Sequence, residues 1–267
     1  MVVVTTAAGY YLAQRGSCDW GRLGFTLLGT GLAAAGASAL NQVAEREFDA
    51  LMPRTANRPL PTGRVRPLEA SLFGIGLAVK GILVLAIFVN LMTAALGILT
   101  LATYLFLYTP AKRRTTVCTI IGAVPGALPV MMGFTAINGA ITTQALVLFA
   151  VLFVWQMPHF LSIAILYRDD YVKGGFQMLP AADPALVATT RQIMLYSLTL
   201  IPMTLLPVML GTTGMMYLVP AVLLGALFCA FGMICARSKT RASARNLFLV
   251  SIAYVPALLA SMLIGKI

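Results

Sequence analysis

The chain has 267 residues, of which 60% are apolar and only 10% are charged, and its mean hydropathy is +0.90. Soluble domains carry charge on about a quarter of their residues, so this composition excludes a soluble protein. A net charge of +11 does not require nucleic acid as a partner, because basic loops beside a membrane and contacts with anionic lipids account for it.

Apolar runs of roughly 17 to 25 residues recur along the chain, which is the length of a membrane-spanning helix. Spanning segments must satisfy their backbone hydrogen bonds internally, so these runs predict helices and exclude open strands. We expect one all-α domain over residues 1–267, with nine helices at 1–14, 23–46, 67–88, 91–108, 117–135, 143–166, 191–210, 215–236 and 246–265. The first helix is expected to be short or truncated, because the chain begins part-way into that run without a basic segment or a cleavage site.

The basic residues fall on one side of this layout. Of the nineteen Lys and Arg residues, three (Arg15, Arg22 and Lys266) border one set of loops and Lys80 lies within a helix. The remaining fifteen lie in or beside the other set, at 47–66, 109–116, 167–190 and 237–245. Because positively charged loops stay in the cytoplasm, we expect a multi-pass protein of the bacterial cytoplasmic (inner) membrane, with these loops on the cytoplasmic side.

Scarce acidic residues gather at the same side. Asn41, Glu45 and Asp49 recur every four residues, and each step turns only about 40° around a helix, so the three side chains share one face. Oxygen ligands without His or Cys favour magnesium or calcium. The arginines in the following loop suit phosphate oxygens. Although acids at this spacing are more often a solvated face, the arrangement favours a diphosphate held through a metal at the membrane surface.

A second acidic pair, Asp169 and Asp170, lies in another loop of that side. Adjacent residues do not share a helical face. A metal contact therefore suits one of them better than both, and an ion pair with Arg168 or Lys173 is the alternative role for the other.

Three tracts carry a resemblance. NQVAEREFDALMPRTANRPLPTGRV (41–65), YTPAKRRTTVCTIIGAVPGALPVMMGF (108–134) and WQMPHFLSIAILYRDDYVKGGFQMLP (155–180) resemble the UbiA-type intramembrane prenyltransferases and cover about a third of the chain. The first tract together with W-Q-M-P-H-F resembles more narrowly the branch of that family that farnesylates haem. The resemblance implies a nine-helix bundle around a central cavity, with the two acidic segments facing each other at its cytoplasmic mouth.

The resemblance also implies a reaction. A farnesyl group moves from farnesyl diphosphate to a vinyl group of haem B, with addition of water, giving haem O for terminal oxidases. Magnesium is the implied cofactor, with manganese as a substitute because it accepts the same oxygen ligands. The implied partners are farnesyl diphosphate, haem B and the lipid bilayer, with a haem A synthase or a terminal oxidase assembly factor as candidates, and no nucleic acid.

The implied site residues fall into three groups. The catalytic group is Asn41, Glu45, Asp49 and His159; the metal ligands are Glu45, Asp49, Asp169 and Asp170; and the diphosphate-binding group is Arg54, Asn57, Arg58, Lys112, Arg113, Arg168, Tyr171 and Lys173.

His159 is the only histidine and lies in an apolar helix. A lone histidine there is usually a packing residue, but ionisable groups within a membrane are functional candidates. Because it falls within a matching tract, a role facing the haem is expected, as an iron ligand or in proton transfer.

Two other functions remain alternatives. One is a UbiA-type transferase with another aromatic or tetrapyrrole acceptor, which the tract at 155–180 disfavours. The other is a secondary transporter, which would place charges near the midplane and often shows inverted repeats. Neither feature is evident in the sequence.

Overall fold

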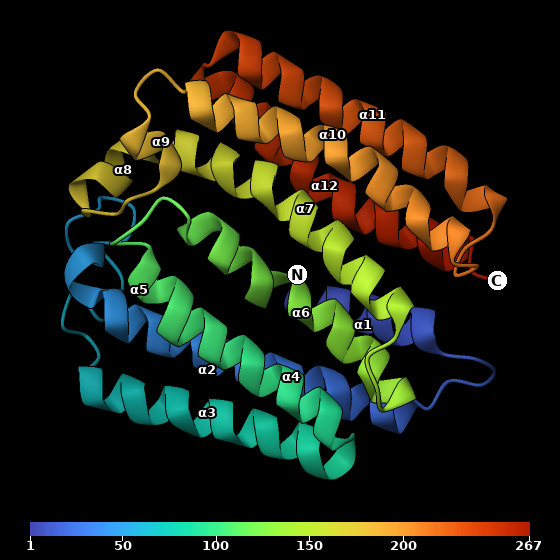
Figure 1. Cartoon of the computed structure of the whole chain (residues 1–267). Helices are drawn as coiled ribbons and strands as arrows, with labels where there is room; N and C mark the ends of the chain where they lie inside the picture. Colours follow the sequence, from blue (N-terminus) through green and yellow to red (C-terminus); the bar gives the residue numbers. More distant parts are fainter.

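Long helices lie side by side in the computed structural model, which describes residues 1–267 (Figure 1). Eight stretches are long and apolar enough to cross a membrane. They are α2 (Trp20–Asp49), α3 (Pro67–Phe88), Leu91–Ala111, α6 (Cys118–Asn138), α7 (Thr143–Leu166), α10 (Val187–Met209), α11 (Met215–Ser238) and α12 (Arg241–Ile264). The stretch Leu91–Ala111 comprises α4 (Leu91–Ala102), the π-helical segment η1 (Thr103–Tyr108) and α5 (Thr109–Ala111).

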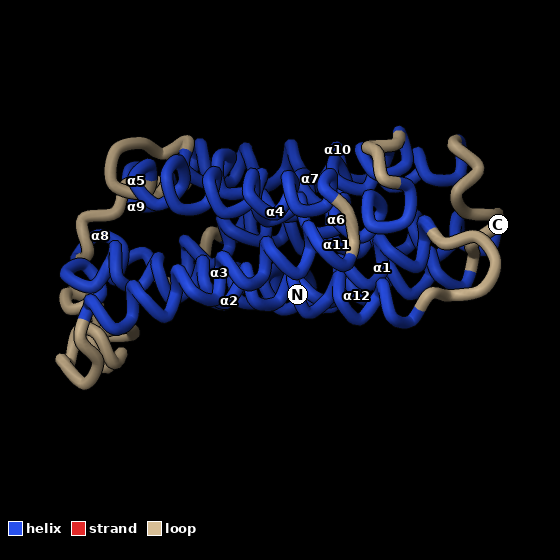
Figure 2. Tube along the Cα trace, turned by 90° about the horizontal axis from the view of Figure 1, so that it is seen from below, coloured by secondary structure: helices blue, strands red, loops and turns tan.

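A shorter apolar helix, α1 (Val2–Ala13), completes the nine predicted helices. Its twelve residues extend only about 18 Å, and its N-terminal end lies near the middle of the bundle in both views (Figures 1 and 2). It packs closely on α6, where Gly133 faces the backbone of Thr6 and Tyr10. α6 is the most buried of the spanning helices and lies at the centre of the fold.

The loops gather at the two ends of the bundle (Figure 2). The short helices α8 (Arg168–Lys173) and α9 (Leu179–Ala182) lie at one end together with α5 and the loop that follows α2, and the C-terminus lies at the other. The predicted alternation of basic and weakly charged loops is therefore present in the fold. Lys80 is exposed on the outer face of α3, so it does not face the interior.

Several helices extend beyond their predicted bounds because polar residues cap them. α2 begins at Trp20 rather than 23, where the Asp19 side chain accepts from the backbone N–H of Arg22. α10 begins at Val187 rather than 191, behind Asp183, which accepts from the backbone N–H groups of Val187 and Thr189. α12 begins at Arg241 rather than 246, after the N-cap Thr240. These caps satisfy the backbone N–H groups of the first turn, which have no partner within the helix. A pattern of apolar residues does not reveal such polar caps.

Glycines bring α2 and α3 into close backbone contact. Gly36 on α2 faces the carbonyl of Gly74 and the backbone of Ala78, while Gly81 on α3 faces the backbone of Ala33. Within a membrane, small residues permit this approach and allow extensive van der Waals packing. α3 contacts only α2 and α4 closely, so this seam is its main attachment to the fold.

The seam can be tested by two substitutions on α3. A Cβ on Gly81 would lie 2.5 Å from the Ala33 backbone nitrogen, whereas a Cβ on Gly76 would meet nothing within 4 Å. Gly81→Ala should therefore lower the Tm in detergent by about 5 °C through overpacking. Gly76→Ala should leave the Tm unchanged or slightly raised, because alanine is the better helix former. Equal Tm values for the two variants would contradict the close seam.

Candidate active site

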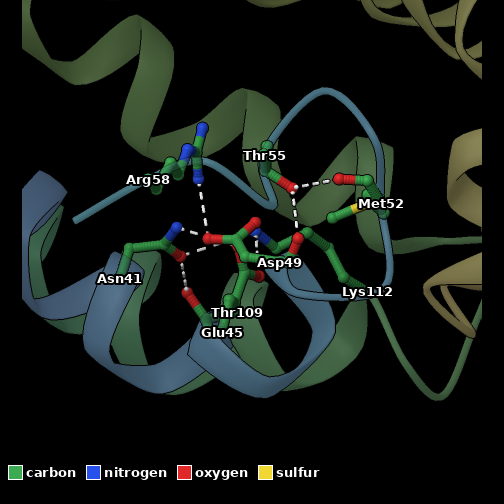
Figure 3. Close-up of polar contacts among 8 residues, drawn as sticks. All are labelled: Asn41, Glu45, Asp49, Met52, Thr55, Arg58, Thr109 and Lys112. Atoms are coloured by element: carbon green, nitrogen blue, oxygen red, sulfur yellow. Dashed lines mark hydrogen bonds and ion pairs between the residues drawn. The ribbon is translucent and has the colours of Figure 1, made fainter. Parts of the chain in front are cut away.

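The last turns of α2 carry the predicted acidic face. Asn41, Glu45 and Asp49 all lie on one side of the helix and are buried, with 8%, 7% and 1% of their surface exposed. The Asn41 side chain donates from Nδ2 to Glu45 Oε2 at 2.9 Å (Figure 3). α2 continues through Asp49, whereas the sequence predicted its end at residue 46, so all three side chains belong to one helical scaffold.

Each buried carboxylate has a cation from another segment. Lys112 Nζ forms an ion pair with Glu45 Oε1, and Arg58 Nη1 lies 2.8 Å from Asp49 Oδ2 (Figure 3). Lys112 is itself 7% exposed. Removing a carboxylate from water costs several kcal/mol, so these carboxylates need the paired cations to remain charged. The site is thus a buried cluster of alternating charge.

Two threonines complete the cluster. Thr109 donates from Oγ1 to Asn41 Oδ1 at 2.8 Å, which fixes the amide so that its nitrogen faces Glu45. Thr55 donates to the backbone carbonyl of Asp49 at 2.9 Å and folds the loop back over the end of α2. Neither residue was predicted from the sequence, because the residues around a threonine do not show whether it belongs to a binding site or to an ordinary loop.

A widened turn places Thr109 and Lys112 opposite α2. Pro110 cannot donate a hydrogen bond to the Phe106 carbonyl, and its ring would clash with that carbonyl in a regular α-helix. The π-helical segment η1 precedes it and opens the turn. Tyr104 and Tyr108 of this segment then face an internal cavity, and the Lys112 ammonium lies 4.7 Å from the Tyr108 ring centroid.

That cavity has a volume of about 320 Å³ and starts beside the charged cluster. Ala37 and Ser38 line it one turn before Asn41, and Thr30 lines it eight residues further from the cluster, about 12 Å at 1.5 Å per residue. Its walls are largely apolar or small and come from α1, α2, α4, η1, α6 and α7. The cavity suits an extended hydrocarbon chain whose charged end stays at the cluster.

Three of the four predicted cytoplasmic loops, 47–66, 109–116 and 167–190, meet around the cluster. A small apolar core joins them, formed by Met52, Ala111, Cys118, Ala164, Phe176 and Met178. The backbone N–H of Gln177 donates to the Lys112 carbonyl at 2.7 Å. Phe176 packs on Phe48 of α2, with ring centroids 6.0 Å apart. The loops therefore form one lid over the end of α2.

Other predicted diphosphate-binding residues surround the cluster without joining it. The Arg54 guanidinium lies over the Tyr167 ring at 4.7 Å, and that of Arg113 lies over Phe48 at 3.9 Å. Arg168 donates to the Pro184 carbonyl, while Asn57 and Lys173 are exposed. Tyr171 packs on Phe176, and burial raises the pKa of its hydroxyl, which keeps it protonated as a donor.

The second acidic pair does not enter this network. Asp169 is exposed and Asp170 half-buried at the start of α8, and neither carboxylate bonds to another side chain. No three His, Cys, Asp or Glu side chains lie close enough together to hold a metal ion. The metal roles of Asp169 and Asp170 stay predictions.

His159 does not line the cavity; its neighbour Phe160 does. The imidazole lies between α7 and α12, with Nδ1 2.7 Å from the Ser251 hydroxyl, and it stacks on Trp155 and Phe248. Consecutive residues of a helix point about 100° apart. Because Phe160 faces the cavity, the preceding His159 points away from it.

Comparisons with known proteins identify the family of the chain. The sequence matches the UbiA prenyltransferase family over residues 2–255. A protoheme IX farnesyltransferase of Solibacter usitatus is 45% identical, covering 100% of this chain and 94% of the relative. Another, of Aquifex aeolicus, is 38% identical, with 100% and 91% covered.

Solved structures resemble the fold at low sequence identity. A digeranylgeranylglyceryl phosphate synthase superposes with a TM-score of 0.79 at 17% identity, covering 99% of this chain and 92% of that one. A UbiA homolog from Archaeoglobus fulgidus, bound to DMAPP and Mg²⁺, superposes with a TM-score of 0.63 at 16% identity, covering 97% and 94%.

The buried pair between Lys112 and Glu45 can be tested by stability. Lys112→Met leaves the Glu45 carboxylate buried without a cation, which should cost about 3 kcal/mol of unfolding free energy. The double variant Lys112→Met/Glu45→Gln should recover most of this loss, because a neutral amide needs no counter-charge. Thermal melting in detergent measures both, with Arg113→Met as the control on an exposed neighbour. A double variant that melts as low as Lys112→Met would refute the pairing.

Proposed function

This chain belongs to the UbiA prenyltransferase family, and we propose that it transfers a farnesyl group from farnesyl diphosphate to a vinyl group of haem B, giving haem O. The observation that carries the proposal is the buried charged cluster of Asn41, Glu45, Asp49, Lys112 and Arg58 at the mouth of an apolar cavity. Relatives of 38% to 45% identity that bear the name protoheme IX farnesyltransferase support this choice of acceptor.

The cluster matches the charges of the donor. A diphosphate is an anion that needs cations, and Arg58 and Lys112 supply two at the cavity mouth. As the allylic C–O bond breaks, its electron pair leaves with the diphosphate, and fixed positive groups there stabilise the growing negative charge. Arg54, Asn57, Arg113, Arg168, Tyr171 and Lys173 form the outer ring proposed to close over the diphosphate.

Magnesium fits the oxygen donors of α2. Asn41, Glu45 and Asp49 offer one amide and two carboxylate oxygens on one face, which suits a hard cation shared with phosphate oxygens. When bound, the metal would neutralise diphosphate charge during bond cleavage. Manganese accepts the same ligands. We propose Asp169 and Asp170 as further ligands from α8. Solved UbiA homologs bound to Mg²⁺ support a magnesium requirement.

The cavity then determines which group reacts with the allylic cation. Its apolar walls along α2 and α6 keep water from the carbon that loses the diphosphate. The vinyl group supplies two electrons to this carbon, and a new C–C bond forms. The positive charge then rests on the vinyl carbon attached to the ring. Water adds there and releases a proton, which completes the hydroxyethylfarnesyl side chain.

We propose that the charged cluster faces the cytoplasm of a bacterium, because the basic loops gather at its end of the bundle. Cys18 lies at the opposite end, and the other three cysteines are buried. In intact spheroplasts an impermeant maleimide should label Cys18. The reagent should not label a cysteine placed at Thr62 in a Cys18→Ser background until the membrane is opened. The reverse pattern would invert the proposed orientation.

The function itself is tested with purified protein, haem B, farnesyl diphosphate and magnesium. The wild type should form farnesylated haem, detected by mass spectrometry, and chelator should abolish the product. Glu45→Gln and Asp49→Asn should each lower kcat by at least about 10²-fold, the usual cost of losing a transition-state charge contact. Glu47→Gln is the matched control, because Glu47 lies on the same turns but is exposed. Absence of product from the wild type would overturn the proposal.

A further inference from the structure

The internal cavity is bounded at each end by a close contact across the bundle. At the charged mouth, a Cβ added to Gly122 would lie 2.6 Å from Tyr108 Cε2, so α6 and η1 touch there. At the inner end, a Cβ added to Gly97 would lie 3.5 Å from Met132 Cε, so α4 and α6 meet again. All four residues line the cavity. Gly122 and Met132 are ten residues apart on α6, so the cavity is about 15 Å long at 1.5 Å per residue.

Beyond Met132 the bundle is sealed by hydrogen bonds. Thr93 on α4 and Thr135 on α6 lie about one turn further from the charged cluster, and their hydroxyl oxygens are 2.9 Å apart. Asn90 donates from Nδ2 to the Thr135 carbonyl at 2.8 Å. Thr93 and Thr135 have no exposed surface and do not line the cavity. Met132, which is 1% exposed, is therefore the last side chain of α6 between the cavity and this seal.

The length of the cavity corresponds to three isoprene units. Each unit adds four carbon–carbon bonds of about 1.5 Å to the main chain, which gives about 5 Å per extended unit. The α2 wall has nearly the same period, because a helical turn rises about 5.4 Å. Small residues of α2 line the cavity on three successive turns: Ala37 and Ser38, then Ala33 and Ala34, then Thr30. A chain of three units would fill the space from the charged mouth to the inner end, and a fourth unit would meet Met132.

We propose that Met132 determines the chain length of the prenyl donor, because it closes the cavity at the end of the third isoprene unit. This inference rests on the proposed function, in which the diphosphate binds at the charged cluster and the prenyl chain enters the cavity. A smaller residue at this position would extend the cavity by about one turn, as far as the hydrogen bond between Thr93 and Thr135. That is room for one further unit and no more. Met132 lies at the opposite end from the reacting carbon, so its role is in specificity.

The test measures the binding of prenyl diphosphates with two to five isoprene units, in the presence of magnesium and without haem. Each compound displaces radiolabelled farnesyl diphosphate from purified protein in detergent. The partition of a given compound into detergent is the same for every variant, so a comparison between variants reports on the cavity alone. In Met132→Ala the Kd of the four-unit donor, relative to that of farnesyl diphosphate, should fall at least about tenfold below the wild-type ratio, because overpacking of a closed core is relieved. The relative Kd of the five-unit donor should not change.

Two controls separate the end of the cavity from general packing. Met131→Ala removes the same atoms from a neighbouring methionine that is 4% exposed and does not line the cavity, so it should keep the wild-type ratios. Met132→Leu nearly conserves the volume and should also keep the preference for three units. Equal changes in Met131→Ala and Met132→Ala, or no change in either, would overturn the proposal.

A variant of α2 tests the same limit in the opposite direction. Ala34 lines the cavity one turn before Thr30 and is half-buried, so a larger side chain there extends into the space of the third unit. Ala34→Leu should weaken the binding of farnesyl diphosphate at least about tenfold relative to the two-unit donor. Ala35→Leu is the matched control, because Ala35 is exposed and does not line the cavity. An unchanged ratio in Ala34→Leu would contradict the proposal even if Met132→Ala failed to fold.

The assay also separates this inference from the function on which it rests. It contains no acceptor, so the chain-length preference is measured whether or not haem is the substrate. Lack of haem farnesylation with the expected shifts in Met132→Ala and Ala34→Leu would refute the proposed acceptor and leave the chain-length limit standing. Farnesylation of haem by a wild type that binds three-unit and four-unit donors in the same ratio as Met132→Ala would refute the limit and leave the function standing.

Discussion

The buried charge at the end of α2 is the constraint on which the rest of the structure depends. Asp49 and Glu45 are almost fully enclosed, and carboxylates remain charged in such a place only with cations beside them. Those cations come from two separate segments, the loop after α2 and the turn after η1. The loops must therefore fold over the helix end, and the core around Phe176 and Met52 holds them there. The same loops leave the apolar side of α2 free to line the cavity.

Much of this arrangement could be predicted from the sequence because membrane proteins restrict the options. Only helices of sufficient length satisfy their backbone in lipid, so the apolar runs gave nine helices close to their observed positions. The spacing of Asn41, Glu45 and Asp49 identified one helical face because the helix has a fixed periodicity. The distribution of arginine and lysine placed the same loops together. Each of these inferences depends on local pattern alone.

What the sequence could not provide depends on partners distant in the chain. The pairing of Lys112 with Glu45 and of Arg58 with Asp49 is set by tertiary packing, and many basic residues in those loops looked equivalent. The first turns of α2, α10 and α12 were not predicted, because the polar residues that cap these helices interrupt the apolar pattern. The π-helical turn before Pro110 has no sequence period of its own. For His159, hydropathy placed the residue within a helix but not on a particular side of it.

The direction of His159 has a consequence for the chemistry beside α7. Phe160 faces the cavity, which suits the isoprenoid chain, while His159 turns toward α12, where it stacks on Phe248. The side of α7 that faces the cavity is therefore apolar, which matters because the allylic cation reacts with any available nucleophile. His159, the one ionisable group of α7, is bonded to Ser251 on the other side of the helix and so does not intercept the cation.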